Sequence, residues 1–155
     1  METTKYYKRM KAITIVTGVL SLLWIYWTVG RTIATLSCVP LREGHEISQM
    51  SVAIGYCASA LLMIAMQMIF LIKQMKNLKN GVLFDKTSTK YVAIWGACWV
   101  VYDLCSGNID HMIVSGVFDQ LIIHGTALGI PIIAFAFAIL YRLAADVAEE
   151  NNLTI

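Results

Sequence analysis

Residues 47–72 read ISQMSVAIGYCASALLMIAMQMIFLI, a stretch of 26 residues without a charged side chain. A helix needs about 20 mostly apolar residues to cross the hydrocarbon core of a bilayer, which is about 30 Å thick. This stretch is therefore long enough to cross a membrane as one helix. The charged residues at its two ends, Glu46 and Lys73, are expected near opposite membrane surfaces.

Two other uncharged stretches, residues 12–30 and 120–141, also reach the length that a crossing needs. The region between them is less clear, because only residues 91–102 are uncharged before Asp103. The long side chain of Lys90 can extend toward the surface, so a crossing of about 17 residues from there to Gly107 is possible. The alternative is a protein with three crossings and a buried half-helix.

The distribution of basic residues favours four crossings. Cytoplasmic loops of membrane proteins are enriched in Lys and Arg. With four crossings, ten of the twelve basic residues fall on one side of the membrane, and only Arg31 and Arg42 fall on the other. We therefore predict that both termini are cytoplasmic. The predicted spans are residues 12–36, 48–74, 88–107 and 119–143, followed by a cytoplasmic tail at 144–155.

The composition excludes an ordinary soluble domain. The chain has 155 residues, of which 58% are hydrophobic and 14% are charged, whereas about 25% are charged in soluble proteins. A chain of this length cannot hide so much apolar surface inside one domain. We predict a single all-α domain over residues 1–155, an integral membrane four-helix bundle in the inner cell membrane.

The sequence contains no residue pattern that indicates an enzyme, a metal site or a cofactor. The histidines His45, His111 and His124 have no partner at metal-ligand spacing. The four cysteines lack the paired short spacings of a zinc or redox site. Cys38 and Cys105 both fall on the outer side, and whether they form a disulfide is left open. We expect a protein that is not an enzyme and that does not bind nucleic acid directly.

Three polar residues are candidates for function within the spans. Gln67 can form hydrogen bonds between helices. His124 is expected about one turn inside the fourth span, where it either faces the bundle or lies neutral at the interface. Asp103 is expected near the outer headgroups, either paired with Arg31 or His124 or extended alone toward water.

Two cytoplasmic elements carry opposite charge. The loop over 77–90 is rich in lysine, and the tail carries Asp146, Glu149 and Glu150. Residues 77–86, NLKNGVLFDK, and the ending at 148–155, AEENNLTI, resemble the Domain of Unknown Function 2975 family of small bacterial four-helix membrane proteins. The resemblance implies no established activity, but such members are often encoded beside a small helix-turn-helix regulator.

These observations predict a non-enzymatic membrane partner, or signal-transmitting anchor, of a small cytoplasmic helix-turn-helix regulator. Leu153 and Ile155 lie on one face if the end is extended, so the last three residues are either a docking peptide or a disordered end. The alternative function is a small transporter or channel subunit, with Gln67, His124 and Pro131 lining a path, and a homo-oligomer is considered in both cases. The candidate partner contacts are Phe84, Asp85, Glu149, Glu150, Asn151, Leu153, Thr154 and Ile155.

Overall fold

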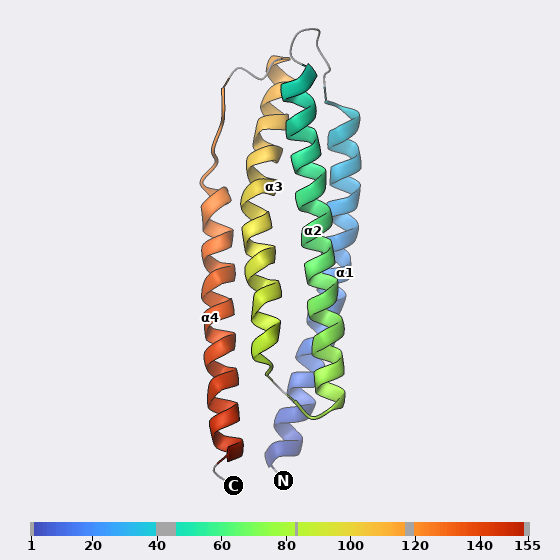
Figure 1. Ribbon diagram of the computed structural model, residues 1–155. Helices are drawn as coiled ribbons and strands as arrows, with labels where there is room; N and C mark the ends of the chain where they lie inside the picture. The colour runs from blue at the N-terminus through green and yellow to red at the C-terminus, as the bar shows by residue number, and fades with distance from the viewer. Residues whose placement is uncertain (1, 40–45, 83, 117–119, 154–155) are drawn as a thin grey trace.

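The computed structural model describes residues 2–39, 46–82, 84–116 and 120–153 (Figure 1). Four long helices account for most of them, which confirms the predicted all-α four-helix bundle. Each is long and apolar enough to cross a membrane, so the fold is that of a multi-pass membrane protein. The elements are α1 (Glu2–Ser37), α2 (Glu46–Lys79), the 3₁₀ turn η1 (Lys86–Ser88), α3 (Thr89–Ser115) and α4 (Thr126–Leu153).

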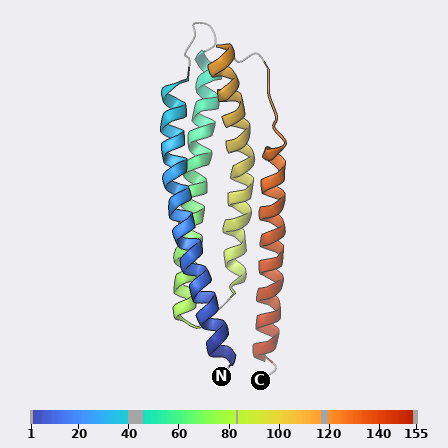
Figure 2. The same ribbon diagram turned by 180° about the vertical axis from the view of Figure 1, so that it is seen from behind.

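The helices run side by side along one axis, in the order of the chain. α1 packs on α2, α2 on α3, and α3 on α4. Figure 2 shows α1 and α4 on opposite sides of the bundle, with both chain termini at the same end. We call this the terminal end, and it also holds the connection between α2 and α3. The opposite end, with the other two connections, is the far end.

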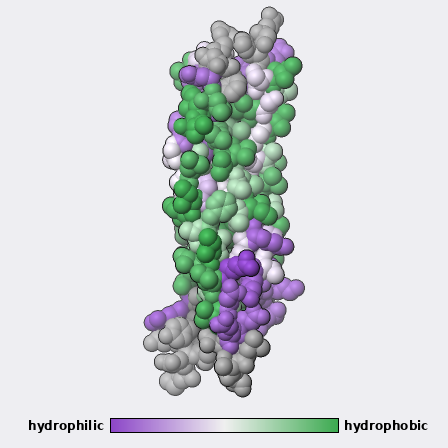
Figure 3. Space-filling model, turned by 60° about the vertical axis from the view of Figure 1, so that its left-hand side comes forward, coloured by the Kyte–Doolittle hydropathy of each residue, from purple (hydrophilic) through white to green (hydrophobic). Residues whose placement is uncertain are grey.

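Large apolar side chains cover the outside of the bundle. Leu61 is 68% exposed and Ile133 is 70% exposed, and both lie in the middle part of a helix. In Figure 3 apolar atoms dominate most of the visible height, whereas the largest hydrophilic group lies toward the terminal end. Such a surface is stable against lipid tails and unstable against water.

The best-buried side chains lie between α2 and α3. Tyr56, Met63, Ile109 and Met112 are fully buried there. The ring of Tyr56 stacks on Tyr102 with centroids 4.8 Å apart, and the two hydroxyl oxygens are 3.0 Å apart and hydrogen-bonded. Each hydroxyl is thereby satisfied away from water, where an unpaired one would be costly.

Two helix ends depend on glycine. Gly81 and Gly116 have φ of 76° and 77°, a left-handed conformation that disfavours other residues. After α2, the amide of Val82 donates to Asn77 O and the amide of Gly81 donates to Leu78 O, the hydrogen-bond pair of a Schellman motif. Asn80 and Gly81 therefore form the turn that ends α2.

The third and fourth spans differ from their predicted bounds. α3 continues to Ser115, past the predicted end at 107, because neighbouring groups bond the polar side chains of its last turns. α4 begins at Thr126, whereas the predicted span begins at 119. Residues 121–124 have no regular structure and run beside α3 (Figure 1). The predicted spans at 12–36 and 48–74 lie within α1 and α2.

Candidate functional site

Asp85 holds the connection between α2 and α3 in place at the terminal end. Its carboxylate accepts hydrogen bonds from Lys73 Nζ at 2.9 Å, from Asn77 Nδ2 at 3.2 Å and from the Thr87 amide at 2.9 Å. Partial burial acts to raise the pKa of Asp85, but these hydrogen bonds outweigh it and hold the pKa well below its ordinary value. Asp85 is thus ionised at neutral pH and fixes the start of η1.

Tyr141 ties this connection to α2 and α4. Its hydroxyl donates to Gln74 Oε1 at 2.8 Å and accepts from the Asp85 amide at 3.4 Å. Its ring lies edge-on to Phe84, with centroids 5.4 Å apart. One side chain of α4 therefore positions two residues of the connection and one residue of α2.

These contacts place Lys86 against the last turns of α4. Lys86 Nζ lies 2.7 Å from Asp146 Oδ1 and 2.6 Å from Glu149 Oε2. All three side chains are exposed, and exposed ion pairs stabilise a fold by at most about 1 kcal/mol each. Around them is a hollow of about 440 Å³. We call this hollow the loop–tail surface, lined by Lys86, Leu143, Asp146, Val147, Glu149 and Glu150.

Only part of the predicted partner contact set lies on this surface. Glu149 and Glu150 do, whereas Phe84 and Asp85 point into contacts within the chain. The family resemblance of residues 77–86 suggested partner contacts at Phe84 and Asp85, but in the structure these two residues contact Tyr141 and Lys73. Asn151 and Leu153 belong to α4, so an extended docking peptide does not start at Leu153. Thr154 and Ile155 lie outside the described residues.

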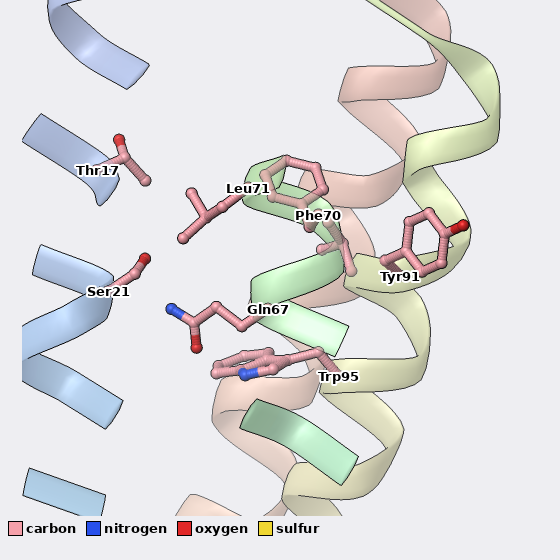
Figure 4. Close-up of a pocket in the computed structure, with 8 residues that line it drawn as sticks. Thr17, Ser21, Gln67, Phe70, Leu71, Tyr91 and Trp95 are labelled. Carbon is pink, nitrogen blue, oxygen red and sulfur yellow. The ribbon is translucent and has the colours of Figure 1, made fainter. Parts of the chain in front are cut away.

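Gln67 projects from α2 into a cavity of about 140 Å³ between α1, α2 and α3. In Figure 4 its amide reaches toward α1, where Ser21 lies, and passes over the ring of Trp95. Gln67 Oε1 and Trp95 Nε1 are both buried and have no hydrogen-bond partner among the described residues. Each unpaired group costs about 1–3 kcal/mol when no water or ligand satisfies it.

Three tryptophans form a cluster on the far-end side of this cavity. The ring centroids of Trp24 and Trp95 are 5.9 Å apart, and those of Trp95 and Trp99 are 5.6 Å apart. All three pack against the buried core of the bundle.

Asp103 and His124 have separate surroundings at the far end. Asp103 Oδ2 accepts a hydrogen bond from Thr126 Oγ1 at 2.8 Å, at the first residue of α4. A carboxylate at a helix N-terminus is stabilised by the helix dipole. His124 lies before α4, and its ring covers Gly107, where an added Cβ would be 2.3 Å from His124 Cδ2.

Arg31 of α1 pairs with α3 near this level. Its guanidinium donates to Ser106 Oγ at 3.2 Å and lies 4.0 Å from the carboxylate of Asp110. It also lies over the ring of Trp27, at 5.3 Å from the centroid. Arg31 therefore contacts Ser106 and Asp110, which lie one and two helical turns beyond Asp103 on α3. The sequence had suggested Asp103 itself as its partner.

Asn108 is a structural residue that sequence reasoning missed. Its Oδ1 accepts from the Ile122 amide at 2.9 Å, and its Nδ2 donates to Ile122 O at 2.9 Å and to Leu104 O at 2.6 Å. It thus satisfies both backbone groups of a residue that has no helix to bond them. The signal in the sequence was Asn108 itself, a side chain that both donates and accepts hydrogen bonds within a mostly apolar helix.

The residues that were expected to line one transport path lie apart. Gln67 faces the cavity between α1, α2 and α3. Pro131 lies on α4 against Gly96 of α3, and His124 lies on Gly107. Cys38 and Cys105 are free thiols. Among the described residues, no group of three His, Cys, Asp or Glu side chains is placed to hold a metal ion.

Comparisons of the chain with protein-family models, curated proteins and solved structures found no match.

Proposed function

We propose that this chain is a non-enzymatic anchor in the inner cell membrane that holds a small cytoplasmic helix-turn-helix regulator. The terminal end faces the cytoplasm in this proposal, because ten of the twelve basic residues lie toward it. The resemblance of residues 77–86 and 148–155 to the Domain of Unknown Function 2975 family supplies the class of partner.

The observation that carries the proposal is the prearranged loop–tail surface. Asp85 and Tyr141 fix the connection from two sides, so Lys86 and the α4 carboxylates are held before any partner arrives. A surface that is already ordered loses less conformational entropy on binding. Leu143 and Val147 supply apolar contact beneath the charged groups.

The charge of this surface suggests how a regulator would be held. DNA-binding proteins carry basic surfaces that contact phosphates. Asp146, Glu149 and Glu150 present three carboxylates on consecutive turns of α4, and Lys86 pairs with the first two. The carboxylates would compete with DNA phosphates for the same basic surface, and a regulator held at the membrane would be kept from its DNA site.

The test is purification of the intact protein from its native membrane, followed by identification of what is bound. We expect a small helix-turn-helix protein in the wild-type sample and its loss in the double variant Glu149→Lys, Glu150→Lys. Asp110→Lys at the far end is the matched control and should retain it. Absence of the regulator from the wild-type sample, or its retention by the double variant, would refute the proposed contact.

Two further measurements address orientation and the tail. A reporter that works only in the cytoplasm should be active when fused after Ile155, and one that works only outside the cytoplasm should be inactive. The opposite result would show that the orientation is reversed. Deletion of 151–155 should leave the helices inserted and weaken regulator binding. If the shortened chain binds the regulator with unchanged affinity, the tail is not part of the contact.

The unpaired amide of Gln67 favours a second candidate, a small transporter or channel subunit. A flux assay on liposomes that contain the purified protein separates this candidate from the first. Transport of a solute that stops in the Gln67→Leu variant would support it.

A further inference from the structure

The cavity beside Gln67 has properties that the anchor function does not use. Its wall is made by Thr17 and Ser21 of α1, by Gln67, Phe70 and Leu71 of α2, and by Tyr91, Val92 and Trp95 of α3. It therefore lies between three helices, and its wall residue Tyr91 contacts Lys73 and Lys90, which lie toward the terminal end.

The volume of the cavity sets the size of what it can hold. At about 140 Å³, it is close to the roughly 150 Å³ of an engineered apolar cavity that binds benzene. A molecule with one six-membered ring fits such a volume.

The polar groups of the cavity set the chemistry. Gln67 Oε1 is a hydrogen-bond acceptor and Trp95 Nε1 is a donor, and both are unpaired. In Figure 4 the Gln67 amide and the Trp95 ring lie next to each other at one side of the cavity. A hydroxyl group both donates and accepts, so one hydroxyl can serve the two groups.

The surroundings also set the charge. All eight residues that line the cavity are uncharged. An ion at this depth would lack a counter-charge in the wall, which is costly inside a membrane. The aromatic rings of Phe70, Tyr91 and Trp95 offer apolar contact to the rest of a small molecule.

A second cavity adjoins the first. It has a volume of about 380 Å³ and lies between α1, α2 and α4, where Ile13, Phe137 and Leu140 form part of its wall. The two cavities share Thr17, Phe70 and Leu71. Ile13, Phe137 and Leu140 are more than half exposed, so the second cavity opens toward the lipid beside the first.

From size, polarity, charge and access, we propose that the cavity beside Gln67 binds a small uncharged aromatic molecule that carries a hydroxyl group, of the phenol class. The hydroxyl donates to Gln67 and accepts from Trp95, and the ring lies among the aromatic side chains of α2 and α3. This site is separate from the loop–tail surface.

The test uses 4-fluorophenol with the full chain in lipid nanodiscs, followed by fluorine nuclear magnetic resonance. A bound signal, distinct from that of probe dissolved in empty nanodiscs, is expected. Fluorobenzene has a similar size and no hydroxyl, so it should bind more weakly by about 25-fold, the effect of two hydrogen bonds at about fivefold each.

Variants separate recognition by Gln67 from simple filling of space. Gln67→Leu keeps a similar volume and should weaken 4-fluorophenol by about fivefold while leaving fluorobenzene unchanged. Gln120→Leu, the same substitution away from the cavity, should bind both probes like the wild type. Trp95→Phe removes the donor and should weaken only the phenol.

Two results would overturn the proposal. One is the same affinity for fluorobenzene and 4-fluorophenol in the wild type, which would mean that the polar pair does not recognise a hydroxyl. The other is no bound signal from either probe, as expected if water fills the cavity or if Gln67 and Trp95 bond to each other. The folded state of each variant is checked by the near-ultraviolet circular dichroism of its tryptophans.

Discussion

The two connections that flank α3 are stabilised in different ways. At the far end, one side chain, Asn108, satisfies both backbone groups of Ile122. At the terminal end, the connection at Asp85 receives bonds from several side chains, so the loss of one leaves others in place. Loss of Asn108 should therefore remove all the side-chain support of the first junction, whereas loss of any one residue at the second junction should remove only part of its support. Backbone groups near lipid have no water to replace a lost partner.

The largest effect is expected at the far end. Asn108→Ala removes three hydrogen bonds and leaves the Ile122 N–H and C=O without their partner. We expect the free energy of unfolding to fall by about 3 kcal/mol, from two unpaired backbone groups. Denaturation in mixed micelles measures it, with Asn80→Ala at the exposed end of α2 as control. A loss no greater than that of the control would remove the contrast between the two junctions.

Acid should weaken the terminal junction next. The pKa of Asp85 is lower in the fold than in the unfolded chain, so its stabilisation is complete above about pH 4. It is lost progressively as the pH falls below that value toward the folded pKa. Melting temperatures measured from pH 6 to pH 3 should show a steeper decline for the wild type than for Asp85→Asn. Equal slopes would show that the Asp85 carboxylate does not hold the connection.

A smaller effect is expected from Tyr141→Phe. The substitution keeps the ring against Phe84 and removes the hydroxyl that bonds Gln74 and the Asp85 amide. We expect a loss of about 1–1.5 kcal/mol in the free energy of unfolding, typical of a hydrogen bond with partial compensation. The same micelle assay measures it. A loss as large as that of Asn108→Ala would mean that the terminal junction also depends on one residue.

The smallest effect on stability should come from Lys86→Ala. Its pairs with Asp146 and Glu149 are exposed, so the loss should be smaller than that of Tyr141→Phe and shrink further with added salt. Regulator binding, by contrast, should change, because the substitution alters the charge of the loop–tail surface. A change in stability without a change in binding would assign Lys86 to the fold alone.

Hydropathy predicted the membrane helices well where the chain was uniformly apolar. α1 and α2 contain the predicted spans 12–36 and 48–74. The method failed where burial by protein replaced burial by lipid. Ser106, Asn108 and Asp110 suggested the end of a helix, but Arg31 and Ile122 bond two of these side chains from outside α3. Residues 121–123 are apolar, and apolar composition does not distinguish a helix from an extended segment.

The candidate site was predicted in its location more than in its residues. The sequence showed opposite charges on the loop and the tail without showing that they meet, and in the structure Lys86 pairs with Glu149. The inward contacts of Phe84 and Asp85 depend on Tyr141, which is 56 residues further along the chain than Asp85. Sequence spacing alone carries no information on a contact between such distant positions. Gln67 was identified, but the unpaired donor of Trp95 beside it was not.

The packing of α1 has a consequence for how the protein is made. Among its described residues, the buried ones are Ser21 and Thr28, both small, whereas Leu20 and Leu23 are 60% exposed. A helix with this distribution is already stable alone in lipid, and its flanking lysines orient it. α3, with Asn108 and Asp103, needs α2 and α4 for its polar groups. α1 is synthesised before α3 and can therefore remain alone in the bilayer, whereas α3, which depends on its neighbours, is synthesised after α2 is present.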